Sequence, residues 1–468
     1  VRYYDADAVV YCSFGESSSS EGYVFEAING ASREKVPVVF VMQDNGYGIG
    51  VPKHEQSANE RLAENFRGIA NLRIEYCDGR DVFDCFRAMD KATRFAASGE
   101  GCAIVYAECV RIGSHSNSDN HTLYRDESEL AAARERDPLP IFKDRLLTEG
   151  LATEEELARA EAEATAQFEE AIRAGMEAPP PDPATVTDHL LPEPHPADEV
   201  VDEEAGEVCT LRQGINLALK GEFRRNPDTF LWGQDMASGE KEGIFKVSDG
   251  MQAEFGPRRV FNAPIAENFI LGTADGFSRF ADHIRVVVEG AEFADYIWPG
   301  FDQVVELSHE YWRTRGQFAP NVVVRLASGG NIGGGLYHSQ NIESVLVTLP
   351  GLRVVQPAFA DDAAGLMRTA LRSRGCTFFL EPKYLYNLPA TRRRVSEEYE
   401  VPFGKGRVRR EGGDLSVITY GTAVHHSLKA AERAEREGIS VEVFDCRSLS
   451  PLDVEGIAAS VEKTGRAV

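Results

Sequence analysis

An acid and an amide follow two apolar runs near the start of the 468-residue chain. Glu16 follows "AVVYCSF" within "FGESSSSEG", and Asn45 follows "VPVVFVM" within "QDNGYG". Their separation, 45 − 16 = 29 residues, fits one strand–helix–strand unit, which would bring both to one edge of a parallel sheet. Carboxylate, amide and main-chain carbonyl oxygens suit Mg²⁺ holding a diphosphate. Main-chain N–H groups of a Gly/Ser turn bind phosphate.

The same turn also has a simpler interpretation. An acid in a serine-rich turn near a helix start is usually there because acids are favoured at that end of a helix. The second element at the right distance is what favours a diphosphate site.

Alternating apolar runs and helical patterns predict a doubly wound parallel sheet in the first part of the chain. Residues 8–14 read as a buried strand, and residues 20–34 read as a helix with Ser20 as its cap. Further strands are predicted at 36–42 and 102–110. A long surface helix is predicted from Thr153, which forms a capping box with Glu156 and carries an apolar stripe at Leu157, Ala164, Phe168 and Ile172.

The composition changes between residues 176 and 208, where seven prolines precede the acidic run "ADEVVDEEAGE". Such a segment cannot build a core, so it is a linker or a wrapping arm, and we favour a solvated acidic spacer. The strand–helix alternation then restarts. Helices are predicted at 211–225, 423–438 and 450–465, and strands at 229–235, 285–290, 321–327, 414–421 and 439–446.

The overall composition excludes several functional classes. A net charge of −25 argues against nucleic-acid or anionic-membrane partners. The eight cysteines include no CxxC pair, which favours reduced thiols and a cytoplasmic location. No apolar run approaches the ~20 residues that span a bilayer. Because the chain opens at Val1 and stops at "TGRAV", we expect a fragment truncated at both ends.

Five segments resemble one family in the order that the family has them. They are "FGESSSSEGYVFEAIN…VPVVFVMQDNGYGIGVP", "VRIGSHSNSDNHTLYR" (110–125), "APIAENFILGTADGF", "VVVEGAEFADYIWPGFDQ" and "GGGLYHSQ". The first two are similar to the alpha side of the thiamine-diphosphate-dependent 2-oxo acid dehydrogenase decarboxylating component, and the last three to its beta side. The chain thus resembles a fusion of both sides.

The resemblance implies an α/β thiamine-diphosphate-binding fold with two doubly wound parallel-sheet domains and a transketolase C-terminal-like domain. We expect an alpha-side domain at 1–175, a linker at 176–208, a beta-side pyrimidine-binding domain at 209–400 and the C-terminal domain at 401–468.

By the same resemblance, Mg²⁺ is held by Glu16, Asn45 and the carbonyl of Tyr47, and Gly15 and Ser17 offer main-chain groups to the diphosphate. Glu16 stands where the family has aspartate. His115 matches a histidine of the cofactor loop, in which Ser114 replaces the first of two histidines. Ser116 lies beside it, and the matching loop is phosphorylated in the mitochondrial members of the family.

On the beta side, Glu267 matches the glutamate that binds the aminopyrimidine, Tyr296 lies in the wall of that pocket, and His338 matches an active-site histidine. Each has an alternative. Glu267 could be an ordinary acid in a first helical turn, His338 an ordinary loop histidine, and Tyr296 and Trp298 core or interface aromatics. His121 is interpreted as solvated surface. His425 and His426 are rejected as a metal site because neighbouring helical residues face different sides.

The implied reaction is oxidative decarboxylation of a 2-oxo acid, with acyl transfer to a lipoyl group of a partner dihydrolipoyl acyltransferase, in a homodimer of the fused chain. Glu267 would bind the cofactor ring, and His115 and His338 would orient the substrate and supply protons. The loop at 110–125 favours a branched-chain substrate, 3-methyl-2-oxobutanoate, with pyruvate and acetoin open. A ketol transferase and an inert scaffold are the rival interpretations.

Overall fold

The computed structural model describes residues 3–4, 7–199, 204–237 and 242–468. The chain divides into two compact units, Val1–Pro183 and Ala184–Val468. No helix in the described ranges is long and apolar enough to cross a membrane. The eight cysteines are free thiols.

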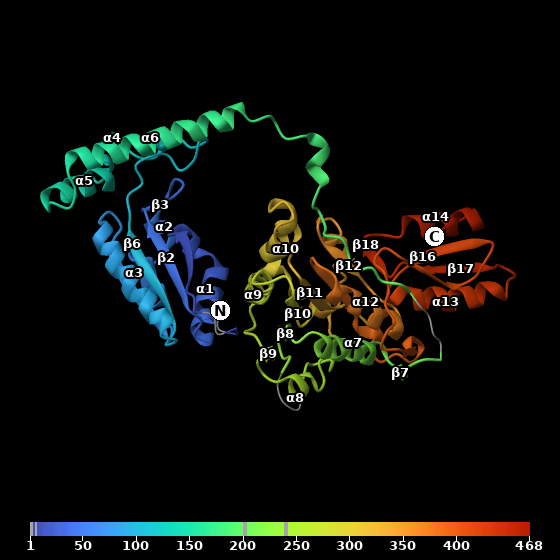
Figure 1. Cartoon of the computed structure of the whole chain (residues 1–468). Coiled ribbons are helices and arrows are strands. Elements are labelled where there is room, and N and C mark those ends of the chain that lie inside the picture. Colours follow the sequence, from blue (N-terminus) through green and yellow to red (C-terminus); the bar gives the residue numbers. More distant parts are fainter. Residues whose placement is uncertain (1–2, 5–6, 200–203, 238–241) are drawn as a thin grey trace. The chain divides into compact units, whose positions relative to one another are not determined.

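The first unit is built on a four-stranded parallel sheet with the order β1-β2-β6-β5. Helix α1 and the turn at Leu62–Phe66 pack on one face, and α3 packs on the other (Figure 1). The predicted doubly wound sheet is therefore present. The strands are β1 (Val10–Gly15), β2 (Val38–Asp44), β5 (Leu72–Asp78) and β6 (Cys102–Glu108), and the two covering helices are α1 (Gly22–Glu34) and α3 (Val82–Ala97).

Two local predictions in this unit are wrong. β1 is not buried, because it is an edge strand paired only with β2, and Val10 and Tyr11 are 46% and 52% exposed. Ser20 does not cap α1. The serine run winds into a short 3₁₀ turn (Ser17–Ser20), so α1 begins later and the Ser20 hydroxyl donates to the Gln56 carbonyl at 3.2 Å.

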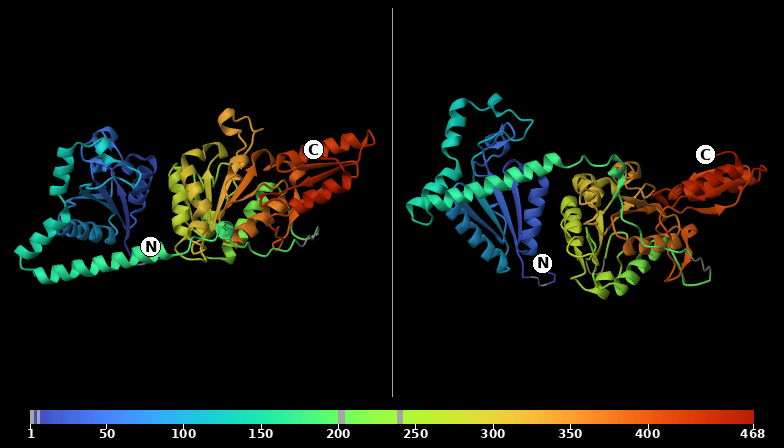
Figure 2. Two further views of the ribbon diagram at one scale, coloured as in Figure 1. Left: turned by 90° about the horizontal axis from the view of Figure 1, so that it is seen from above. Right: turned by 45° about the horizontal axis from the view of Figure 1, so that its top comes forward.

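Shorter elements complete the first unit. The hairpin β3 (Tyr47–Gly48) and β4 (Val51–Pro52) leads into α2 (Lys53–Gln56). Helices α4 (Glu127–Glu135), α5 (Pro138–Thr148) and α6 (Glu154–Glu177) follow β6. α6 is one continuous helix (Figure 2), and the predicted capping box of Thr153 and Glu156 is present.

The second unit is built on a seven-stranded sheet with the order β18-β12-β13-β11-β10-β8-β9, parallel except for β18. Its large core lies on the face covered by α7 and α12, and α9 packs on β10. The strands are β8 (Thr229–Gly233), β9 (Val260–Asn262), β10 (Arg285–Ala291), β11 (Val322–Ser328), β12 (Arg353–Val355), β13 (Thr377–Pro382) and β18 (Ser448–Ser450). The helices are α7 (Leu211–Arg225), α8 (Met251–Phe255), α9 (Glu267–Ser278), α10 (Phe301–Arg313), α11 (Glu343–Leu346) and α12 (Ala360–Arg372).

The end of the chain forms a smaller three-stranded sheet with the order β15-β17-β16, flanked by α13 and α14 (Figure 1). Its elements are β15 (Arg407–Arg410), β16 (Leu415–Thr419), α13 (Thr422–Glu435), β17 (Val441–Asp445) and α14 (Val454–Thr464), and a two-stranded sheet pairs β7 (Glu207–Cys209) with β14 (Arg393–Val395). The predicted strands and helices of this half are therefore present, within a few residues of their expected bounds.

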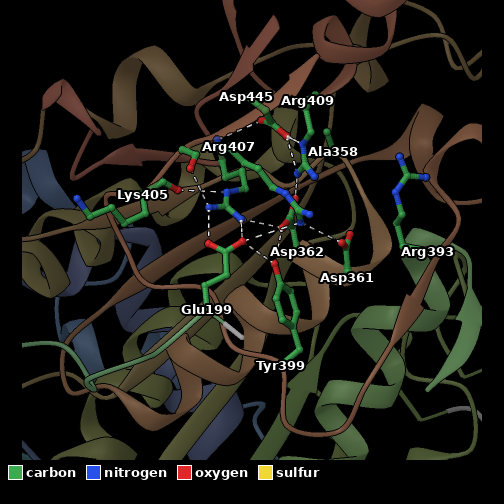
Figure 3. Close-up of polar contacts among 12 residues, drawn as sticks. Glu199, Ala358, Asp361, Asp362, Arg393, Tyr399, Lys405, Arg407, Arg409 and Asp445 are labelled. Carbon is green, nitrogen blue, oxygen red and sulfur yellow. Dashed lines mark hydrogen bonds and ion pairs between the residues drawn. The ribbon is translucent and has the colours of Figure 1, made fainter. Parts of the chain in front are cut away.

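Residues 186–199 of the proline-rich segment form a wrapping arm and not the solvated spacer that the composition favoured, whereas residues 176–185 are exposed and residues 200–203 lie outside the described ranges. Within the second unit, the Val186 carbonyl accepts from the indole of Trp312 at 2.9 Å, and the His195 N–H donates to the Ser373 hydroxyl at 2.9 Å. The carboxylate of Glu199 reaches a buried network with Tyr399 and Asp362 (Figure 3). Composition missed these contacts because their partners lie far along the chain.

Candidate active site

Glu16 directly follows β1 and is the most deeply buried of the predicted site residues, with 1% exposure. Its Oε2 accepts from the main-chain N–H of Asn45 at 3.1 Å, and its Oε1 accepts from the Ser17 hydroxyl at 3.2 Å. Burial raises the pKa of this carboxyl, although the hydrogen bond from Asn45 acts against the rise. No cationic side chain in the described part of the chain forms an ion pair with it. Among these residues, the carboxylate therefore lacks a counter-charge.

The structure places Asn45 beside Glu16, as the 29-residue spacing predicts, and Tyr47 lies in the turn that Asn45 begins. The Asn45 side-chain oxygen accepts from the Tyr47 N–H at 3.3 Å, which closes a tight turn after β2. Asp44 fixes the base of this turn. Its carboxylate, 3% exposed, accepts from the Gly46 N–H at 2.9 Å and from the Lys53 ammonium at 2.8 Å.

Gly48 permits the close approach of these loops, and Gly15 leaves open space beside the serine turn. A Cβ on Gly48 would lie 2.0 Å from the Ser17 hydroxyl oxygen, so only glycine fits beside the serine turn. No heavy atom outside the neighbouring residues lies within 4 Å of a Cβ built on Gly15. Gly15, Glu16 and Ser17 thus form one wall, and the turn at 45–48 forms the other.

His115 lies in the long loop between β6 and α4, and its side chain is exposed. The Asp119 carboxylate holds the loop by accepting from the His115 N–H at 2.8 Å and from the Tyr124 hydroxyl at 2.7 Å. Tyr124 in turn accepts from Arg111 at 2.7 Å. His121 is predicted to be solvated surface, but in the structure it is partly buried and its Nδ1 is shielded from solvent.

In the second unit, Glu267 is the first residue of α9 and is 9% exposed. Its Oε1 accepts from the side-chain amide of Gln234 at 2.8 Å. Gly300 lies against it, since a Cβ there would come within 3.0 Å of the Glu267 Cβ. One oxygen is thus held by an amide, which fixes the carboxylate at the start of the helix.

His338 and Tyr296 come together in the same unit. The His338 ring lies edge-on to Phe293, with centroids 4.3 Å apart, and 5.5 Å from the ring of Tyr296. Tyr296 and Trp298 are 42% and 40% exposed, so neither is a core aromatic of this unit. His425 lies inside α13 and its Nε2 is 2.8 Å from the Ala358 carbonyl oxygen, which is a structural contact.

The groups around Glu16 fit a hard cation. A buried carboxylate without a counter-charge, a neighbouring amide oxygen and main-chain carbonyls are oxygen donors, which Mg²⁺ prefers. Within the described residues, no group of three or more His, Cys, Asp or Glu side chains could hold a metal. The single carboxylate of Glu16 therefore implies a ligand set completed by amide, carbonyl, phosphate or water oxygens.

Sequence reasoning missed the residues that hold the candidates in place. Gln234, Asp119 and Asp295 each bind a candidate residue or its loop. Gln234 had a detectable signal, because it is a polar residue directly after the buried strand β8, at the carboxyl edge of the sheet. The acids did not, since nothing local distinguishes them from other loop acids.

Comparison with known proteins decides the family. Residues 1–184 match the dehydrogenase E1 component, residues 207–389 match the transketolase pyrimidine-binding domain, and residues 404–468 match the transketolase C-terminal domain. The 2-oxoisovalerate dehydrogenase subunit beta of Bacillus subtilis is 39% identical over 265 residues, covering 55% of this chain and 78% of that protein.

The chain belongs to the E1 component family of thiamine-diphosphate-dependent 2-oxo acid dehydrogenases. The E1 beta subunits of pyruvate dehydrogenase from Staphylococcus aureus strain Mu50 and Staphylococcus epidermidis are 41% and 40% identical over 261 residues, each covering 55% of this chain and 78% of the relative.

These matches confirm the family, the fold and the enzyme class predicted from the sequence. This E1 chain carries an alpha-like region followed by beta-like regions. Relatives named for 2-oxoisovalerate and for pyruvate are similarly close, at 39% and 41% identity, so the identities do not separate the two substrates.

Proposed function

We propose that this chain decarboxylates a branched-chain 2-oxo acid and passes the acyl group to a lipoyl group of a partner acyltransferase. The observation that carries the proposal is the buried Glu16 carboxylate, bonded to the Asn45 N–H and without an ionic partner in the described residues. A Mg²⁺ ion would supply the missing positive charge at this edge of the sheet and would also bind the diphosphate.

In the first unit, Glu16, the Asn45 side chain and the Tyr47 carbonyl would hold Mg²⁺. The main chain at Gly15 and Ser17 would donate to the diphosphate, since a turn opening a helical segment presents N–H groups to anions. The Gly48 main chain lies against Ser17, which keeps the two walls of the cradle in register. His115 would orient the substrate from a loop held by Asp119.

In the second unit, Glu267 would hold the aminopyrimidine ring, and Tyr296 would contribute to the wall around it. When bound, thiamine diphosphate supplies the carbon that adds to the keto group and takes up the electrons left as CO₂ departs. His338, held between Phe293 and Tyr296, would donate a proton during acyl transfer to the lipoyl sulfur.

The branched-chain substrate is the finer part of the proposal. It is supported by the loop at 110–125 and by the similarity to the 2-oxoisovalerate dehydrogenase subunit beta. The relatives are subunits by name, which supports a multienzyme complex and an acyltransferase partner. We also propose a homodimer of the chain, which sedimentation velocity would test.

Calorimetric titration of thiamine diphosphate into the chain, with Mg²⁺ and with Mg²⁺ chelated, tests the cradle. The variant Glu16→Ala removes the carboxylate. Glu21→Ala is the matched control, because Glu21 is exposed and its side chain makes no capping bond. We expect Mg²⁺-dependent binding in the wild type and in Glu21→Ala, and its loss in Glu16→Ala.

Binding without Mg²⁺, or equal binding by Glu16→Ala, would contradict the metal role of Glu16. An acceptor-dye assay with 3-methyl-2-oxobutanoate and pyruvate then tests the substrate. A higher kcat/KM for pyruvate would overturn the branched-chain assignment and leave the cofactor assignment intact.

A further inference from the structure

The loop that carries His338 is exposed and rich in glycine. Between Gly329 and Gln340, the residues Gly329, Asn331, Gly333 and Gly335 have positive φ angles, and Leu336 and Tyr337 are 70% and 66% exposed. The base of the loop is closed by one bond from the Gly329 N–H to the Gln340 carbonyl at 3.0 Å. Within the loop, the Ser339 hydroxyl donates to the Gly335 carbonyl at 2.6 Å, but an exposed segment of this kind needs contacts with other elements to hold one arrangement.

Asp295 holds the main chain of this loop from outside the loop. Its Oδ1 accepts from two successive main-chain N–H groups, those of Ser339 at 3.2 Å and of Gln340 at 3.0 Å. The carboxylate is only 7% exposed. These bonds fasten the two residues directly after His338 to a buried anion, and hydrogen bonds to a charged group are the stronger kind.

The turn that carries Asp295 also holds the imidazole. Asp295 lies in the 3₁₀ turn Ala294–Tyr296, which follows β10 of the seven-stranded sheet. The rings of Phe293 and Tyr296 at either end of this turn are the two that contact His338. One short turn, set by a core strand, thus contacts both the main chain beyond His338 and its ring.

A third contact limits His338 from within its own loop. A Cβ on Gly334 would come within 2.7 Å of the His338 Cβ, so the backbone passes directly against the histidine. The Phe293 ring, which packs against His338, also lies 5.4 Å from the ammonium of Lys383, measured to the ring centre. The charges of Lys383 and Asp295 interact as well. The Oδ2 atom of Asp295 accepts no hydrogen bond from a described residue.

We propose that Asp295 is the positioning residue for His338, holding an exposed glycine-rich loop in one arrangement through its bonds to the Ser339 and Gln340 N–H groups. This inference rests on the role of His338 in the proposed function, but its structural part is measured without the reaction. Asp295 acts through His338, because its two bonds run to the main chain directly after that residue.

Three variants separate the hydrogen bonds from other effects. Asp295→Ala removes the acceptor. Asp295→Asn keeps an oxygen at the Oδ1 position and loses the charge. Asp302→Ala is the matched control, because Asp302 is exposed and lies seven residues further on, in α10.

The first readout is amide hydrogen exchange, by mass spectrometry, of a peptide that contains Ser339 and Gln340. We expect exchange in Asp295→Ala to accelerate at least about tenfold, because the variant loses two hydrogen bonds to a charged group. Asp295→Asn should stay closer to the wild type than Asp295→Ala does, and Asp302→Ala should not differ from the wild type. The second readout is the rate at which diethyl pyrocarbonate modifies His338, which should rise only in Asp295→Ala.

Steady-state kinetics connect the positioning of His338 with its role in the reaction. If His338 acts in acyl transfer, kcat in Asp295→Ala should fall toward that of His338→Ala with little change in KM, and the double variant should be no slower than His338→Ala. Full activity in His338→Ala would refute the proposed role of His338, while the exchange data would still decide the role of Asp295. Unchanged exchange and unchanged modification in Asp295→Ala would overturn the inference.

Gly334→Ala gives an independent test should Asp295→Ala fail to fold. The added methyl group pushes on His338 from the loop side and leaves the buried turn intact. We expect faster modification of His338 with unaltered circular dichroism. No change in His338 reactivity would contradict a tightly held histidine.

Discussion

Arg447 forms a bidentate ion pair with Glu199, in which Nη1 and Nη2 each lie 2.9 Å from a different carboxylate oxygen. Arg447 is fully buried and also donates to Asp362 of α12 at 2.9 Å. Glu199 comes from the proline-rich arm, and Arg447 lies between β17 and β18. The pair therefore ties the arm to the segment between β17 of the small sheet and β18 of the large sheet in the second unit.

Removal of Glu199 should destabilise the second unit. Glu199 and Asp362 are the carboxylates that form ion pairs with buried Arg447 among the described residues. Glu199→Ala leaves Asp362, and we expect a loss of about 3 kcal/mol in the free energy of unfolding, because Glu199 itself is partly exposed. Denaturant unfolding of the chain measures it. Glu163→Ala, on the exposed face of α6, is the control and should change stability by less than about 0.5 kcal/mol.

The same pair gives a pH dependence with a defined sign. Burial raises the pKa of Glu199, but the hydrogen bonds and charge of Arg447 and its neighbours outweigh burial and lower it overall. A lowered pKa in the folded state adds stability that is complete above the unfolded pKa, about 4.3, and is lost as the pH falls. The stability difference between wild type and Glu199→Ala should therefore shrink below pH ~4. A difference that grew on acidification would contradict the ion pair.

Gly48 should be required for cofactor binding. In Gly48→Ala, the new methyl group would overlap the Ser17 hydroxyl, whose oxygen lies 2.0 Å from the Cβ position, so the two walls of the cradle must move apart. We expect the Kd for thiamine diphosphate with Mg²⁺ to rise at least about tenfold, or ~1.4 kcal/mol. Calorimetry measures it, with Gly68→Ala as the control, because no atom lies within 4 Å of a Cβ there. Unchanged affinity would place the diphosphate elsewhere.

Local pattern predicted most of the fold, and its failures have identifiable causes. Buried strands such as β2, β6 and β11 read as apolar runs because both of their faces are covered. The run at β1 reads the same way, yet pairing on one edge only leaves it exposed. Whether a strand lies at an edge depends on the rest of the sheet and is not written in its own residues. The Glu199–Arg447 pair, 248 residues apart, was equally out of reach.

The candidate site, like the fold, has features that the sequence predicts and others that it does not. Strand ends and spacing were enough to bring Glu16 and Asn45 together, because one strand–helix–strand unit fixes both. The actual bond runs to the Asn45 main chain, which side-chain types do not predict. The roles of Gln234 and Asp295 depend on contacts between separate elements, and only the folded chain shows them.

Gln234 should hold Glu267 in its working position. In Gln234→Ala, the carboxylate loses the 2.8 Å amide bond that fixes its orientation at the start of α9. A displacement of about 1 Å in a catalytic group can cost ~100-fold, so we expect kcat to fall between about tenfold and a hundredfold. Steady-state assays with the 2-oxo acid measure it. Gln317→Ala, at an exposed position, should keep full activity, and full activity in Gln234→Ala would show that Glu267 needs no such support.

Lys383 should make the stability of the second unit rise at alkaline pH. Burial lowers the pKa of this ammonium from 10.5 to about 8, although the charge of Asp295 acts in the opposite direction. Between pH 8 and 10.5 the unfolded chain therefore binds a proton that the folded chain does not, and stability increases with pH. Relative to Lys383→Met, the wild type should gain up to about 3.4 kcal/mol across this interval, at about 1.36 kcal/mol for each pKa unit.

Denaturant unfolding of wild type and Lys383→Met at several pH values between 8 and 10.5 gives the free energy of unfolding of each protein as a function of pH. The gain is the difference between the slopes of the two curves. Groups that titrate in both proteins cancel in that difference, including the buried cysteines. Lys429→Met, at an exposed position on α13, should follow the wild type throughout. Parallel curves for wild type and Lys383→Met would mean that the ammonium keeps an ordinary pKa beside Phe293 and Asp295.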